Sequence, residues 1–144
     1  MRTVASFLCG AVLVLPLYGQ QPAVKRKPGD HVHYNVSLAD GDVSKVTRVS
    51  MVLATNAPEA PNQLGSQGQF GADCQKTKDD PKVWFCDGLI PPNIRPGDYR
   101  VLNVVVATDD FGKGYHEDFH VPLVPIENPN TFTPPTKVTV TPQP

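Results

Sequence analysis

The chain has 144 residues, of which only 19% are charged, and its net charge is −1. No excess of basic residues is available to attract nucleic acid or an anionic membrane surface, so we expect neither as a partner. Sixteen prolines and eleven glycines are spread along the sequence. They indicate many turns and short elements, which favours an all-β fold over a helical one.

Residues 1–20 have the pattern of a secretory signal peptide. Arg2 gives the positive start, and residues 4–17 form an apolar stretch that is too short to cross a bilayer, which takes roughly 20 residues. No second apolar stretch of spanning length follows. We therefore expect a secreted or periplasmic protein with no membrane span after cleavage.

The expected domain covers residues 29–126 and follows an N-terminal arm at 21–28. Residues 31–38 alternate between apolar and polar side chains, as in a half-buried antiparallel strand. A second strand is predicted over 43–54. Residues 56–68 have no periodicity and are predicted to form the longest loop.

Two cysteines, Cys74 and Cys86, remain after removal of the signal peptide. They lie in two predicted strands, 69–74 and 82–87, which are separated by the turn residues of Lys78-Asp79-Asp80-Pro81. An even pair of cysteines in an oxidising compartment is expected to be bonded. The spacing lacks the close Cys-x-x-Cys pattern of redox or metal sites, so the sequence predicts a structural disulfide across a hairpin.

The longest apolar stretch after the N-terminus lies within residues 98–108, and it is rich in valine, which suits a buried strand. Its alternation changes phase, because Tyr99 and Val101 have one parity whereas Val104 and Val106 have the other. A one-residue β-bulge at Leu102-Asn103 would place all four on one face.

The chain is expected to return through a turn at 109–114 and a last strand at 115–121, which Pro122 and Pro125 end. Residues 127–144 are rich in proline and predict an extended tail. Within that tail, residues 137–141 alternate valine with threonine and could pair as an extra edge strand.

The order of several short motifs resembles that of bacterial immunoglobulin-like and fibronectin-III-like modules. These motifs are Pro28-Gly29-Asp30, Ile90-Pro91-Pro92, Pro96-Gly97-Asp98-Tyr99-Arg100-Val101 and Ala107-Thr108-Asp109-Asp110-Phe111-Gly112. The resemblance covers roughly residues 29–126 and implies an antiparallel β-sandwich. It also implies that Gly97-x-Tyr99 is a tyrosine corner, whose hydroxyl bonds to upstream backbone. Val101 stands where antibody-type domains place a cysteine, and Trp84 falls on a later strand than their buried tryptophan.

Three aspartate-containing turns would emerge at one end of the fold if the strands alternate up and down. Their carboxylates could hold calcium, which prefers oxygen ligands on flexible loops, but aspartate also favours turns because it bonds its own backbone. We expect that these aspartates form turns and bind no metal. The candidate residues are Asp40, Asp42, Asp79, Asp80, Asp109 and Asp110.

Histidines occur in two same-face pairs, His31/His33 and His116/His120, and Asp118 lies between the second two as a possible oxygen ligand. These side chains could ligate a transition metal if the first and last strands were neighbours. The alternative, which we favour, is the solvent-facing side of two half-buried strands.

Other features allow two further interpretations. Tyr34, Trp84 and Tyr115 could stack on sugar rings if exposed, although such aromatics are more often part of a core. Asn35-Val36-Ser37 matches the sequence of a glycosylation site.

No nucleophile–base set typical of an enzyme is evident in the sequence. We therefore expect no enzymatic activity and no cofactor. The predicted function is that of an exported immunoglobulin-like module for surface, periplasmic or extracellular interaction with other proteins. The alternative is a secreted calcium- or carbohydrate-binding β-sandwich.

Overall fold

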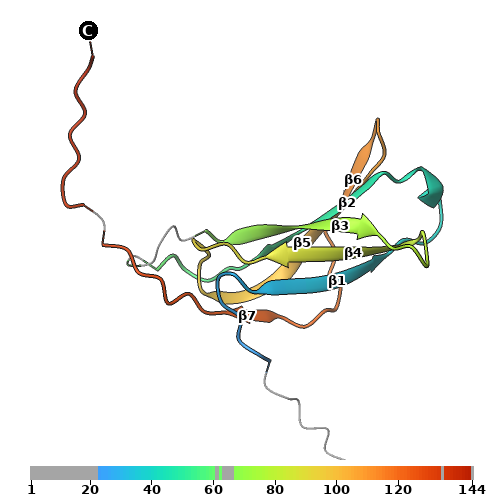
Figure 1. Cartoon of the computed structure of the whole chain (residues 1–144), viewed down its shortest axis with the longest axis horizontal. Helices are drawn as coiled ribbons and strands as arrows, with labels where there is room; N and C mark the ends of the chain where they lie inside the picture. The colour runs from blue at the N-terminus through green and yellow to red at the C-terminus, as the bar shows by residue number, and fades with distance from the viewer. Residues whose placement is uncertain (1–22, 61, 63–66, 134, 144) are drawn as a thin grey trace, which may run out of the picture.

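The computed structural model describes residues 23–60, 62, 67–133 and 135–143 (Figure 1). The predicted signal peptide, residues 1–20, lies outside this part of the chain. The described residues contain seven β-strands and one short 3-10 helix. Their bounds are β1 (His31–Ser37), η1 (Val43–Lys45), β2 (Arg48–Ala54), β3 (Gln69–Lys76), β4 (Val83–Leu89), β5 (Gly97–Ala107), β6 (Gly112–Tyr115) and β7 (Val124–Ile126).

The strands pair in the order β1-β4-β3-β2-β5-β6, and β7 pairs with the first residues of β5. Every pairing between these strands is antiparallel, so the predicted all-β antiparallel class is confirmed. Figure 1 shows β1, β3 and β4 lying side by side along the long axis, with the C-terminal tail extending away from the strands. The pairing places the connections 38–47, 77–82 and 108–111 at one end of the sheet.

The predicted bulge in β5 is present. Val52 of β2 pairs with Asn103, but the next residue, Leu53, pairs with Val101, which leaves Leu102 as the extra residue. As a result Val101 and Val104 are both buried despite their opposite parity. The bulge keeps the inward face of the strand apolar on both sides of the irregularity.

The core lies on the inner face of the sheet. It gathers alternate residues of five strands, including Val32, Leu53, Phe70, Trp84 and Val101. Burying each large apolar side chain contributes about 1.5–3 kcal/mol. Cys86 is also fully buried, is directly opposite Cys74 in the β3–β4 register, and forms a disulfide with it.

Two predicted strands differ from the structure. Residues 43–47 form η1 and a short connection instead of the start of β2, because Asp40 and Gly41 both have positive φ and reverse the chain before it. The last predicted strand, 115–121, is wrong: β6 covers only residues 112–115. The turn before β6 is short because the Thr108 amide donates to the Phe111 carbonyl and the Thr108 hydroxyl accepts from the Phe111 amide. β6 pairs only with the last residues of β5; towards the start of β5 come first the bulge and then the pairing with β7.

The packed part of the chain continues past residue 126, where the domain was expected to end. Asn128 is buried, and its amide donates hydrogen bonds to the carbonyls of Ile94 (2.7 Å) and Pro92 (3.1 Å). The N-terminal arm is exposed, yet Arg26 bridges to Ile126 of β7. Residues 137–141 form no strand, so the tail interpretation fits that segment.

Tyr99 has the hydrogen bond expected of a tyrosine corner. Its side chain is fully buried, and its hydroxyl donates to the Arg95 carbonyl at 2.6 Å, with the Gln67 carbonyl 3.2 Å away. Burial raises the pKa of Tyr99 to about 12. Gly97 has a φ of +148°, and a Cβ there would lie 2.6 Å from the Ala57 Cβ, so only glycine fits this entry to β5.

The disulfide is expected to stabilise the fold by about 3 kcal/mol, because it closes a loop across 12 residues of sequence separation in the unfolded chain. Urea denaturation of the oxidised and the reduced chain measures this difference. The Cys74→Ala/Cys86→Ala variant should match the reduced chain and show no response to reductant. Equal midpoints for the oxidised and reduced chains would show that the bond contributes nothing.

Replacing Tyr99 with phenylalanine should cost about 1–3 kcal/mol, because the part-buried hydrogen bond from its hydroxyl to the Arg95 carbonyl is lost. Tyr115→Phe is the matched control, since Tyr115 is exposed, and its cost should stay within about 0.5 kcal/mol. Denaturant unfolding of the two variants compares them directly. Equal costs would mean that the corner does not contribute to stability.

Tyr99→Phe should also remove a dependence of the unfolding free energy on pH in the alkaline range. Since the folded state raises the pKa of Tyr99 to about 12 from 10.0, folding favours the neutral phenol. The stability from this group is complete below pH 10 and is lost as the pH rises towards 12. The difference in unfolding free energy between the wild type and Tyr99→Phe should therefore shrink over that range, and a constant difference would contradict the assignment.

Candidate functional site

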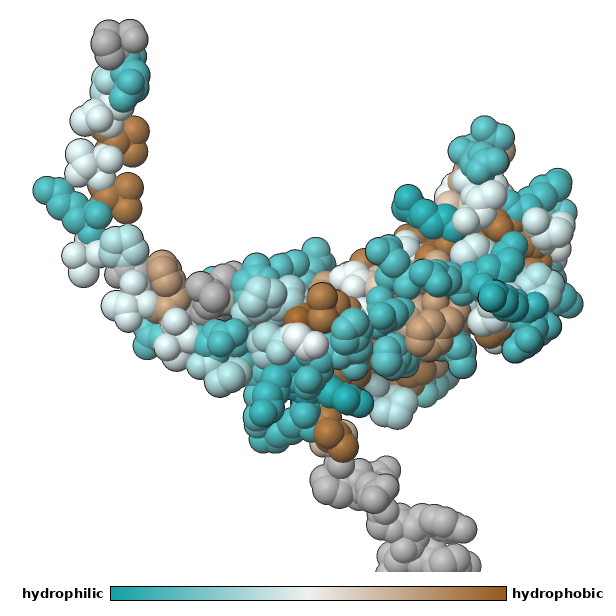
Figure 2. Space-filling view, in the orientation of Figure 1, coloured by the Kyte–Doolittle hydropathy of each residue, from teal (hydrophilic) through white to brown (hydrophobic). Residues whose placement is uncertain are grey.

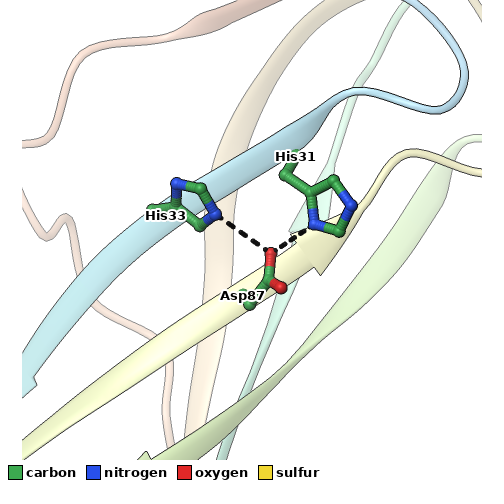
Figure 3. A network of polar contacts seen from close by, with 3 residues as sticks. All are labelled: His31, His33 and Asp87. Carbon is green, nitrogen blue, oxygen red and sulfur yellow. Dashed lines mark hydrogen bonds and ion pairs between the residues drawn. The ribbon is translucent and has the colours of Figure 1, made fainter.

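A cluster of two histidines and an aspartate lies on the exposed face of β1 and β4 (Figure 3). His31 and His33 are two residues apart in β1, so their side chains are on the same face. Asp87 of β4 is directly opposite His33 in the register. Its Oδ1 lies 2.7 Å from His31 Nδ1 and 3.3 Å from His33 Nε2.

The second histidine pair does not join this cluster. His116 and His120 follow β6, which pairs with β5 at the far edge of the sheet from β1. Asp118 contacts His120 of its own segment, with 3.3 Å between Oδ2 and Nδ1. The hypothesis that all four histidines converge is therefore wrong. The sequence pattern does not point to Asp87, because only the register between β1 and β4 places it beside His33.

The three aspartate turns do lie at one end of the sheet, but they do not assemble an ion site. In the described part of the chain, the one group of three or more potential metal ligands is His31, His33 and Asp87. Asp42 forms an ion pair with Lys45, and the Asp80 carboxylate accepts a hydrogen bond from the Lys82 amide at 2.9 Å. These are the local contacts typical of turn aspartates.

The aromatic residues do not form a sugar-stacking platform. Trp84 is buried in the core, and Tyr34 is half-buried on the same inner face. Tyr115 is exposed, on β6. The glycosylation sequence begins at Asn35, whose side chain is on the exposed face of β1 together with those of the two histidines.

A groove of about 530 Å³ opens on the inner side of the sheet, between β1 and the segment that follows β6. We call it the lateral groove; its apolar lining includes Tyr34, Val36, Leu38, Val104, Val106 and Phe119. In the described structure β1 pairs only with β4, and β6 pairs only with β5. Two edge strands therefore border a concave apolar surface. On the face that Figure 2 shows, hydrophobic residues are scattered among hydrophilic ones.

The comparisons with protein-family models, with curated proteins and with solved structures give no match for this chain. Among the described residues, no helix is both long enough and apolar enough to span a membrane.

Millimolar calcium should leave the melting temperature unchanged, because the turn carboxylates do not converge and some already have local partners. A thermal melt with and without calcium tests this expectation, with Asp109→Asn as the comparison variant. A calcium-dependent rise that Asp109→Asn abolishes would show that the turns rearrange into a site.

Proposed function

We propose that this chain is an exported, non-enzymatic immunoglobulin-like module that binds other proteins. The lateral groove is the observation that supports this proposal. A surface that is apolar, concave and bordered by unpaired strand edges suits an extended segment from another chain, which can add backbone hydrogen bonds to an edge and place alternate side chains in the groove.

The tyrosine corner supports the immunoglobulin-like part of the proposal. In sandwiches of that class, a tyrosine near the start of a late strand bonds backbone a few residues upstream. Here Tyr99 is the third residue of β5 and bonds the carbonyl of Arg95. The Cys74–Cys86 bond between adjacent strands takes a different place from the inter-sheet disulfide of antibody domains.

The occupant we propose for the groove is residues 137–141 of a second copy of the chain. This segment reads Lys-Val-Thr-Val-Thr, and an extended conformation places both valines on one face. Val138 is 77% exposed and Val140 is 88% exposed. Both therefore have apolar surface that could be buried, and β-branched residues suit a strand.

The position of the tail favours insertion into a neighbour over insertion into its own groove. The Phe132 amide bonds the carbonyl of Asn62, in the connection between β2 and β3. That connection is at the end of the sheet opposite to the turn at 38–42, which borders the groove. Figure 1 shows residues 135–143 directed away from the strands. Head-to-tail contacts of this kind join different surfaces of each copy.

Sedimentation velocity over a range of protein concentrations tests the proposal. The intact chain should associate, and Val138→Asp/Val140→Asp should weaken association at least about tenfold, because two buried valines contribute a few kcal/mol. Thr139→Asp/Thr141→Asp is the matched control: it adds the same charge on the opposite face and should have the smaller effect.

Two results would contradict this proposal. One is an intact chain that stays monomeric at every concentration and does not bind a synthetic peptide of residues 135–143. The other is association that the double variant Val138→Asp/Val140→Asp leaves unchanged. Melting temperatures of both variants should equal that of the intact monomer, because the substituted residues lie in the exposed tail.

A further inference from the structure

The cluster of His31, His33 and Asp87 has no role in the proposed strand binding, because it lies on the outer face of the sheet. We propose that these three residues bind a divalent transition-metal ion of the Zn²⁺ type. Imidazole nitrogen combined with carboxylate oxygen is a ligand set for zinc and its neighbours in the first transition series, whereas calcium takes oxygen ligands only.

The backbone holds the three ligands in place before any ion binds. His31 and His33 are both in β1, and seven consecutive residues of that strand are in register with β4. Asp87 follows Cys86, whose disulfide to Cys74 fixes β4 to β3. The ligands thus lie on paired strands and not on loops, so less conformational entropy is lost when an ion binds.

The distances between ligand atoms are close to those that a tetrahedral ion requires. Zinc bonds of about 2.0–2.1 Å at tetrahedral angles separate neighbouring ligand atoms by about 3.3 Å. The His33 Nε2 to Asp87 Oδ1 distance is 3.3 Å, and the His31 Nδ1 to Asp87 Oδ1 distance is 2.7 Å. All three ligand atoms lie within 4.8 Å of one another. Small side-chain rotations would therefore admit the ion.

The charges around Asp87 also favour a cation. Asp73 of β3 is directly opposite Asp87, on the same exposed face, and like charges opposite each other across a sheet are destabilising. Within the described part of the chain, Asp73 forms no ion pair with a basic side chain. A divalent ion bound to Asp87 would offset this repulsion. It would also leave a coordination position open for water or a partner's side chain, since the protein supplies three ligands.

Isothermal titration of the intact chain with zinc chloride tests the site, using protein purified without a polyhistidine tag. One ion per chain is expected. His33→Asn should weaken binding at least about tenfold, since changes even to residues that only orient a metal ligand cost about 10–100-fold. His116→Asn is the matched control: it removes an exposed histidine outside the cluster and should leave the affinity unchanged.

A second variant and a second measurement make the result independent of folding defects. Asp87→Asn keeps the shape of the side chain and removes its charge, and it should also weaken zinc binding at least about tenfold. Cobalt bound in place of zinc should give the visible absorption of a tetrahedral site in the wild type but not in His33→Asn. No zinc binding at millimolar concentration, or equal losses in His33→Asn and His116→Asn, would overturn the proposal.

Discussion

The buried hydroxyl of Tyr99 is the contact around which the structure is organised. It ties the start of β5 to the carbonyl of Arg95, at a point where β7 pairs with the strand and where a Cβ on Gly97 would lie 2.8 Å from the Thr55 hydroxyl. A phenol can be buried here only because its hydrogen bond is satisfied. With that end of β5 fixed, the bulge at Leu102 turns the rest of the strand so that Val104 also faces the core.

The same arrangement explains why the lateral groove exists. β7 pairs with only three residues at the beginning of β5, and β6 pairs with only four at its end. In the described part of the chain, neither strand pairs with β1. The half-buried residues Val36, Leu38 and Phe119 pack against the core yet line the opening. An incomplete covering of an otherwise apolar face would make the proposed addition of a strand from another chain energetically favourable.

Much of the fold could be predicted from local sequence, because strand period and turn residues are local properties. The phase change between Val101 and Val104 indicated the bulge, and the turn between Cys74 and Cys86 indicated the disulfide hairpin. The length of β6 could not be predicted, since it depends on what else pairs with β5. Only part of the His31–His33–Asp87 cluster could be predicted. Alternation places His31 and His33 on one face, but Asp87 joins them through a strand register that tertiary structure sets. Likewise the aspartate turns share one end without their side chains converging, because common location does not fix side-chain direction.

The two proposals use opposite faces of the same strand. Inward residues of β1, such as Val36, line the groove, whereas the outward histidines form the cluster. Under both proposals β1 would contact a protein partner and an ion at once, because successive side chains point to opposite sides. A strand added at its free edge would extend the sheet without covering the outer face.

Insertion of the tail into the lateral groove is tested most directly by a nuclear Overhauser experiment on a mixture of isotope-labelled and unlabelled chains, filtered for contacts between different copies. Tail insertion predicts intermolecular contacts from the methyl groups of Val138 and Val140 to Leu38 and Phe119 in the groove. The absence of such contacts in an associated sample, or contacts from these methyl groups to another surface, would contradict it.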